Sequence, residues 1–124
     1  KNGELLIDQR LESSSMGGMW EFPGGKKNTG ESIKQTIKRE LQEELGIVVK
    51  VGAKLLSFDH VYTHKKLYFT VHICEWISGE PKPLASQKLQ WVFPSKLYNF
   101  AFPAANTKII SELHKYIGIS NEKL

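Results

Sequence analysis

The sequence predicts an α/β fold of the α+β kind, a sandwich of helices on a mixed β-sheet. Three observations indicate this class. A strand-forming segment covers residues 66–77, an amphipathic helical segment covers residues 32–45, and the order along the chain is strand, helix, strands, helix. The 124 residues are a usual length for one folding unit, so we expect a single domain over residues 1–124.

Four segments have the composition of β-strands. The strongest, residues 66–77, is rich in aromatic and β-branched residues and is closed by a Ser-Gly-Glu-Pro turn. Asn2-Gly3 is typical of a hairpin turn between two strands, so we also expect a strand before Lys1 and a sequence that is part of a longer chain. The predicted strands cover residues 5–8, 55–61, 66–77 and 90–93.

Two segments have the start and stop signals of helices. The first covers residues 32–45, with Thr29 or Ser32 as its N-cap and Gly46 as its stop. The second covers residues 107–117 and is followed by another glycine. Together, the strands and the two helices predict a β-sheet that is flanked by helices.

Composition and charge exclude several classes of protein. Hydrophobic residues make up 40% and charged residues 24%, which is too apolar for a disordered chain. Cys74 is the single cysteine, so the chain has neither an internal disulfide nor a zinc site built from cysteines. No apolar stretch approaches the length of about 18 residues that spans a membrane. The net charge of +4 favours polyanionic ligands such as nucleotides, and we expect a cytoplasmic protein.

The first predicted helix carries glutamates beside its apolar face. At 100° per residue, Glu44 and Glu40 lie within about 20° of Ile33, at one edge of the apolar stripe, and Glu43 lies about 80° from Ile33. A run of charges on a helix is usually its solvated face, and that interpretation stays open. Here, however, the solvated face is formed by Lys38, Gln42, Gln35 and Arg39. The apolar stripe consists of Ile33, Ile37, Leu41 and Leu45.

Three carboxylates this close together repel one another and raise one another's pKa unless a cation lies among them. Oxygen ligands without a nearby histidine favour Mg²⁺, with Mn²⁺ as a substitute, over zinc. Gly24-Gly25 precedes the helix, and Glu31 lies at its first turn. Alone, these residues indicate a plain turn and a charge that complements the helix dipole.

The spacing of these residues resembles the signature of the Nudix hydrolase family. Five residues separate Gly25 from Glu31, seven separate Glu31 from Arg39, and the segment Arg39-Glu40-Leu41-Gln42-Glu43-Glu44-Leu45-Gly46-Ile47 completes the match. The resemblance implies an α/β/α sandwich on a mixed sheet. It also implies Mg²⁺ bound by the signature glutamates, and hydrolysis of nucleoside diphosphates linked to another group.

Within the family, the chain is most similar to the MutT type, which hydrolyses 8-oxo-dGTP to 8-oxo-dGMP and pyrophosphate. Four segments carry this similarity: Gln9-Arg10, residues 20–26, Gly79-Glu80-Pro81 and residues 102–106. It implies an 8-oxo-dGTP diphosphatase that cleans the nucleotide pool, with a role in DNA repair and replication. It also places the first strand of the family fold before Lys1.

Carried over position by position, the similarity implies these roles. Glu40, Glu43 and Glu44 are catalytic metal ligands, the Gly25 carbonyl is a further ligand, and Arg39 orients one of the carboxylates. Arg10 and Lys26 supply positive charge to the substrate phosphates, although Arg10 taken alone is as readily a surface charge. Glu21 is a supporting or structural acid near the substrate.

Asn106 matches the asparagine that reads the purine edge. Its side chain offers both donor and acceptor groups, which suits oxidised guanine, whose N7 has become a donor. The alternative is a helix cap, because Asn106 immediately precedes the second predicted helix.

One departure concerns the general base. In the MutT prototype, a glutamate in the loop between the last strands is a candidate base, whereas residues 82–89 contain no carboxylate. Glu80 at the edge of this loop is the nearest acid. This favours Glu40 or Glu44 as the group that acts on the attacking water.

Two rival functions remain open. The first is the C-terminal 8-oxoguanine-recognition domain of an adenine DNA glycosylase, which would make DNA a partner. The intact metal signature argues against it. The second is a Nudix pyrophosphohydrolase for CTP or another nucleotide. Otherwise we expect a monomer that binds a small nucleotide and no membrane.

The remaining histidines and aromatic residues carry weaker signals. We expect a histidine inside the sheet at His72, and surface histidines at His60, His64 and His114. The aromatic residues of the strands are more typical of a core than of a platform for stacking bases. They are Tyr62, Tyr68, Phe69, Trp76 and Trp91.

Overall fold

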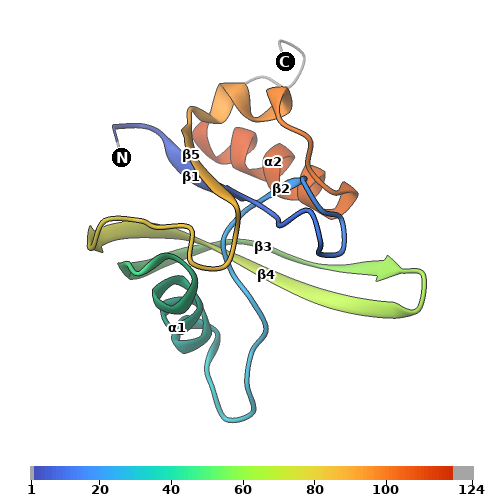
Figure 1. Cartoon of the computed structure of the whole chain (residues 1–124), viewed down its shortest axis with the longest axis horizontal. Coiled ribbons are helices and arrows are strands. Elements are labelled where there is room, and N and C mark those ends of the chain that lie inside the picture. Colours follow the sequence, from blue (N-terminus) through green and yellow to red (C-terminus); the bar gives the residue numbers. More distant parts are fainter. Residues whose placement is uncertain (1, 119–124) are drawn as a thin grey trace.

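The computed structural model describes residues 2–118. In chain order, its elements are β1 (Leu5–Gln9), β2 (Trp20–Glu21), α1 (Ile33–Leu45), β3 (Val48–Tyr62), β4 (Lys65–Ser78), β5 (Lys88–Val92), a 3-10 helix η1 (Pro94–Asn99) and α2 (Ala104–Ile117). The strands lie between α1 and α2, and the β3–β4 hairpin extends beyond both helices (Figure 1). The predicted fold class, a sandwich of helices and sheets, is confirmed.

The described strands form two sheets, in which every pair is antiparallel. One sheet has the order β2-β1-β5, and the other is the β3–β4 hairpin. β1 pairs with β5 from Leu5 opposite Val92 to Gln9 opposite Lys88. This arrangement differs from the single mixed sheet that we expected. A tight turn joins β3 to β4 and therefore makes them antiparallel, and the strand expected before Lys1 lies outside the described residues.

Two hydrophobic clusters hold the layers together, one under each helix. Against α2, the core contains Ile7, Trp20, Val92 and Leu97. Against α1, it contains Leu41, Leu45, Ile47, Val49 and Val51, and Leu6 packs against them. Successive residues of β1 thus point to opposite clusters, as a strand between two layers requires. The next residue on the α1 side of β1 is Asp8, and this places an acid beside α1.

Helix α1 begins and ends where its sequence signals predict. Ser32, not Thr29, is the N-cap, and it forms a capping box with Gln35. The Ser32 hydroxyl accepts a hydrogen bond from the Gln35 backbone N–H at 3.1 Å, and the Ser32 N–H donates to Gln35 Oε1 at 2.8 Å. Gly46 ends the helix in the left-handed conformation, with φ 71°.

The turn at the start of the chain also has its predicted geometry. Asn2 and Gly3 both have positive φ, at 52° and 83°. A two-residue hairpin turn of type I′ requires positive φ at both of its central residues.

Other boundaries differ from the prediction. β3 starts at Val48, not at residue 55, and register shifts interrupt its pairing between Val51 and Leu56. These irregularities break the alternating pattern that identifies a strand in a sequence. β2 and η1 were not predicted. No helix among residues 2–118 has the length and apolar character that crossing a membrane requires.

Two predictions about single residues are wrong. His114 is fully buried, because α2 turns it toward the core, where its Nε2 lies 2.7 Å from the Pro94 carbonyl oxygen. Tyr68, expected in the core, is 69% exposed on the outer part of the hairpin. Trp76 and Trp91 do pack together, with ring centroids 5.4 Å apart.

Candidate active site

Helix α1 presents its three glutamates at different depths. The Glu40 side chain is 13% exposed, whereas that of Glu43 is 59% exposed. Glu44 is partly buried and lies between the helix and the acids of β1 and β2. This order of depth follows the angular positions predicted from the sequence, because Glu40 and Glu44 flank the apolar stripe.

Arg39 ties this helix face to the loop before it. Its guanidinium donates to both oxygens of Glu31, at 2.6 and 3.0 Å, and to Glu40 Oε1 at 2.8 Å. It also donates to Glu43 Oε2 at 3.2 Å and to the Lys26 carbonyl oxygen at 2.9 Å. These contacts raise the pKa of Arg39, and hydrogen bonding to Arg39 lowers the pKa of Glu31 to about 2. Arg39 therefore fixes the Glu40 carboxyl in orientation.

Gly25 lies directly against the Glu40 carboxyl group. A Cβ added at Gly25 would collide with the carboxyl carbon and both oxygens of Glu40. Only glycine therefore permits this approach of the loop to the helix. It also brings a second kind of oxygen, from the loop backbone, into the neighbourhood of the carboxylates.

Strands β1 and β2 contribute two more acids to the same place. Asp8 and Glu21 are direct cross-strand partners, and Arg10 Nη1 donates to Glu21 Oε1 at 2.7 Å. Burial, and then the neighbouring Glu21, raises the pKa of Asp8 to about 7. Burial, and then the hydrogen bond and charge of Glu40, raises the pKa of Glu44 to about 8, and Asp8 and Glu21 add to this effect. Four carboxyl groups, those of Asp8, Glu21, Glu40 and Glu44, thus share one region.

This acid cluster fits a hard divalent cation. Burial and neighbouring acids raise the pKa values of Asp8 and Glu44, and a cation among these carboxylates would offset both effects. Asp8 Oδ1 is buried and has no hydrogen-bond partner in the described part of the chain. Among residues 2–118, however, no three His, Cys, Asp or Glu side chains already surround one metal position. Arg39 pairs with one oxygen of Glu40 and one oxygen of Glu43, so the second oxygen of each carboxylate lies outside these ion pairs.

The residues predicted to bind substrate lie at varying distances from this cluster. Arg10 and Glu21 form the ion pair at its edge, and Arg10 Nε also donates to the Ser15 carbonyl at 2.6 Å. Lys26 contributes its backbone carbonyl to the network and is exposed. Asn106 is partly buried within the first turn of α2. The N-cap of that helix is Pro103, so the alternative of Asn106 as a cap is wrong.

The loop of residues 82–89, which contains no carboxylate, contacts the C-terminal end of α1. The Lys82 and Leu84 N–H groups donate to the carbonyl oxygens of Leu45 and Glu44, at 2.9 and 3.1 Å. The loop thus reaches the last turn of α1 without bringing a carboxylate to it.

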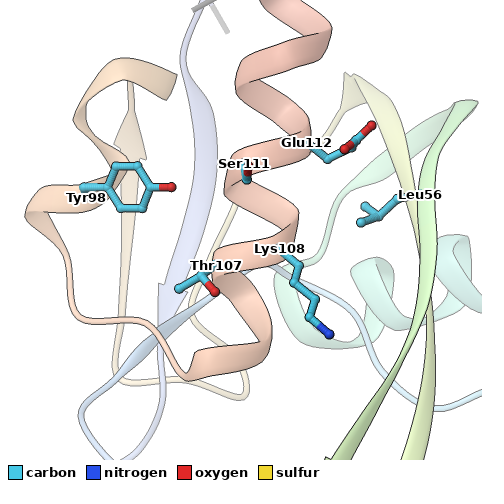
Figure 2. A pocket seen from close by; sticks show the side chains of 6 residues that line it. All are labelled: Leu56, Tyr98, Thr107, Lys108, Ser111 and Glu112. Atoms are coloured by element: carbon cyan, nitrogen blue, oxygen red, sulfur yellow. The ribbon is translucent and has the colours of Figure 1, made fainter. Parts of the chain in front are cut away.

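A separate open cavity of about 490 Å³ lies between α2 and the β3–β4 hairpin. Figure 2 shows Thr107, Lys108, Ser111 and Glu112 on α2, with Leu56 on the facing hairpin and Tyr98 on η1. Neither the acid cluster nor Asn106 lines this cavity. The cavity is therefore distinct from the carboxylate site.

Sequence reasoning missed Asp8 as a site residue. The available signal was its position two residues after Leu6, on the face of β1 that packs toward α1. A carboxylate at such an inward position needs a hydrogen-bond partner or a cation. No sequence pattern predicted the strand β2, which places Glu21 opposite Asp8.

Comparison with known proteins places this arrangement in a family. The profile of the NUDIX domain matches residues 1–112. The chain is 38% identical over 120 residues to an 8-oxo-dGTP diphosphatase of Haemophilus influenzae, which covers 93% of this chain and 88% of that protein. It is 30% identical to a CTP pyrophosphohydrolase of Escherichia coli, over 89% of this chain and 82% of that protein. The structure of a MutT protein from Methanosarcina mazei Go1 matches 94% of this chain and 86% of its own with a TM-score of 0.83 at 28% identity. Signature residues, fold and sequence identity agree, and the chain belongs to the Nudix family.

Proposed function

We propose that this protein hydrolyses 8-oxo-dGTP to 8-oxo-dGMP and pyrophosphate in a Mg²⁺-dependent reaction. The observation that carries the proposal is the convergence of Glu40 and Glu44 with the Gly25 backbone beside Arg10, the residue that follows β1. Similarity to an 8-oxo-dGTP diphosphatase over 93% of the chain supports this substrate. In a cytoplasm that replicates DNA, this activity would remove an oxidised precursor before it is incorporated.

The cation would be held by Glu40, Glu43 and Glu44 with the Gly25 carbonyl. When bound, Mg²⁺ lowers the pKa of a coordinated water and neutralises charge on phosphate oxygens. Mn²⁺ offers the same preference for oxygen ligands. Arg39 would keep one carboxylate of the set in a fixed orientation while the others turn toward the cation.

The remaining chemistry falls to residues around this set. Glu40 or Glu44 would accept the proton of the attacking water, since each has a carboxyl group in the cluster. Arg10 and Lys26 would bind the phosphates, and Glu21 would hold Arg10 through their 2.7 Å ion pair.

A panel of nucleotides tests the proposal. Hydrolysis with Mg²⁺ is measured as pyrophosphate release from 8-oxo-dGTP, dGTP, dATP and CTP, and as AMP release from ADP-ribose. We expect a strong preference for 8-oxo-dGTP, and Glu44→Gln should lower turnover by orders of magnitude because it removes a ligand. Glu75→Gln is the matched control, since Glu75 is an exposed glutamate on β4.

The outcomes separate the rival functions. Preferred cleavage of CTP would keep the chemistry and replace the substrate, which the similarity to a CTP pyrophosphohydrolase makes the second candidate. If the folded protein hydrolyses none of the nucleotides in the panel, the proposal is contradicted. Binding to DNA that contains 8-oxoguanine would then support the lesion-recognition module.

Asn106 carries the proposed preference for the oxidised base. Asn106→Ala should remove a donor and acceptor pair from the base edge, leaving polar atoms of the base unpaired. We expect the ratio of kcat/KM for 8-oxo-dGTP to that for dGTP to fall by about tenfold or more. An unchanged ratio would show that Asn106 does not read the base, and Thr107→Ala serves as the neighbouring control on α2.

A further inference from the structure

The loop between β1 and β2 begins with Arg10, which would bind the substrate phosphates. It covers residues 10–19 and is called the β1–β2 loop below. The Arg10 guanidinium donates to Glu21 Oε1 at 2.7 Å and to the Ser15 carbonyl oxygen at 2.6 Å. A long side chain binds a ligand better when its backbone is already fixed, because ordering the chain on binding costs conformational entropy. The contacts that fix the Arg10 backbone therefore bear on substrate binding.

The β1–β2 loop folds tightly back on its own start. The Arg10 N–H donates to the Met19 carbonyl oxygen at 2.8 Å, and the Gly18 N–H donates to the Arg10 carbonyl oxygen at 3.1 Å. A Cβ added at Gly17 would collide with the Glu12 backbone, and Gly18 has a positive φ of 79°. Most residues of the loop are exposed, and an exposed loop opens easily unless another part of the chain holds it.

Gln87 connects the β1–β2 loop to β5. It immediately precedes β5, and its backbone N–H donates to the Gln9 carbonyl oxygen at 3.0 Å, which continues the pairing of β5 with β1. Its side-chain Nε2 donates to the Arg10 carbonyl oxygen at 2.8 Å and to Glu12 Oε1 at 3.2 Å. An amide nitrogen carries two hydrogens, so it can donate both bonds at once. One side chain, 77 positions from Arg10 in the sequence, thus contacts both the start of the loop and a carboxyl group within it.

We propose that Gln87 is a positioning residue, whose amide holds the β1–β2 loop closed and so keeps the Arg10 guanidinium beside Glu21 for the substrate phosphates. The proposal rests on the proposed function for its kinetic consequences. It gives the loop of residues 82–89, which contains no carboxylate, a part in substrate binding and none in proton transfer. Both bonds of the Gln87 amide are exposed to solvent, so each contributes modestly to the stability of the whole fold. Their loss should act on the loop.

Three substitutions of Gln87 separate hydrogen-bond donation from the size of the side chain. Gln87→Ala removes both donated bonds and should raise KM for the preferred nucleotide about threefold to tenfold, while kcat changes by less than about twofold. Gln87→Glu keeps the shape but sets a carboxylate against the Arg10 carbonyl oxygen and the Glu12 carboxylate, so KM should rise further. Gln87→Lys supplies an ammonium group that can donate to both oxygens and should restore a KM close to that of the wild type. Gln90→Ala, at an exposed glutamine of β5, is the control.

A double substitution tests whether Gln87 acts through Arg10. Arg10→Ala removes the guanidinium and should itself raise KM. In that background, Gln87→Ala should raise KM no further, because the side chain that Gln87 positions is absent. Three kinetic results would overturn the proposal: a wild-type KM in Gln87→Ala, a KM in Gln87→Lys as high as that in Gln87→Ala, and additive effects of Gln87→Ala and Arg10→Ala.

Amide hydrogen exchange, followed by NMR, gives a readout that does not depend on activity. Exchange of the Gly18 N–H reports opening of the loop, because this group donates to the Arg10 carbonyl oxygen. Gln87→Ala should speed this exchange about tenfold. The Gly46 N–H, which donates to the Gln42 carbonyl oxygen at the end of α1, is the control and should not change. Unchanged exchange at Gly18 would overturn the proposal. If the wild type cleaves no nucleotide, the proposed function fails, while exchange at Gly18 still decides whether Gln87 holds the loop.

Discussion

At the scale of single residues, the site depends on how closely backbone and carboxyl groups approach one another. Gly25 lies against the Glu40 carboxyl at a distance that no side chain at position 25 would allow. Arg39 holds the same carboxyl from the other side through a 2.8 Å hydrogen bond. Glu40 is therefore fixed by a glycine and an arginine that lie 14 positions apart in the sequence.

Substitution of Gly25 tests this contact. Gly25→Ala should push the Glu40 carboxyl away and lower kcat by about tenfold to a hundredfold, the effect of a small misplacement of a catalytic group. Steady-state kinetics would measure it, with Lys27→Ala as a control in the same loop. Wild-type kcat in Gly25→Ala would show that the position of Glu40 is not critical.

The sequence predicted the signature residues but not their full set of neighbours. Glu40 and Glu44 follow from helical periodicity, because a helix repeats within one segment of chain. Asp8 was missed, since its importance depends on Glu21, and β2 consists of only two residues that pair with β1. His114 was placed on the surface because the sequence does not show that the carbonyl of Pro94 would face it.

At the scale of elements, α1 is the most completely predicted part of the chain. Its N-cap, its C-cap glycine and its apolar stripe are all local signals, and all have the predicted geometry. β3 was predicted too short because its pairing with β4 shifts register near Gly52, where alternation fails. Helix α2 begins at Ala104, earlier than predicted, because Pro103 occupies the N-cap without a side-chain hydrogen bond.

The capping box of α1 should stabilise the helix that carries the glutamates. Ser32→Ala removes the acceptor of the Gln35 N–H and should lower the free energy of unfolding by about 1 kcal/mol. Urea denaturation measures this change. Thr29→Ala is the matched control and should have an effect below about 0.5 kcal/mol, because Thr29 is exposed and lies outside the cap. Equal effects of the two substitutions would contradict the assigned cap.

At the scale of the whole molecule, the packing of β1 between the two helices creates the site. β1 lies between α1 and α2 (Figure 1). Leu6 packs in the cluster under α1 and Ile7 in the cluster under α2, so Asp8 is again on the α1 side of the strand. The sandwich thereby brings acids from the first strand and from the first helix together. No local sequence pattern contains this contact, because it depends on how the layers stack.

The acid cluster makes stability depend on pH and on metal. In metal-free protein, the pKa of Glu44 is raised to about 8 and that of Asp8 to about 7. The folded state therefore keeps protons that the unfolded chain releases near pH 4, and these groups should make stability fall as pH rises from about 4 to 8. Glu31 acts in the opposite sense, since its pKa of about 2 stabilises the fold above about pH 4.5 and the effect is lost in acid.

Thermal unfolding at pH 6 and pH 8, in EDTA and in Mg²⁺, measures this dependence. Mg²⁺ should raise Tm more at pH 8 than at pH 6, because the ligands must lose their protons to bind it. Glu44→Gln should reduce both the effect of pH and the effect of Mg²⁺. A Mg²⁺ effect that is the same at both pH values would contradict this explanation.

Binding of Mn²⁺, followed by electron paramagnetic resonance, tests most directly whether the carboxylates of α1 hold the cation. Wild-type protein and Glu75→Gln should bind Mn²⁺ with equal affinity, whereas Glu40→Gln and Glu44→Gln should each weaken binding at least about tenfold. Added Mg²⁺ should compete for the same position. Equal Mn²⁺ binding by the wild type and by both α1 variants would show that the cation lies elsewhere and would contradict the proposed active site.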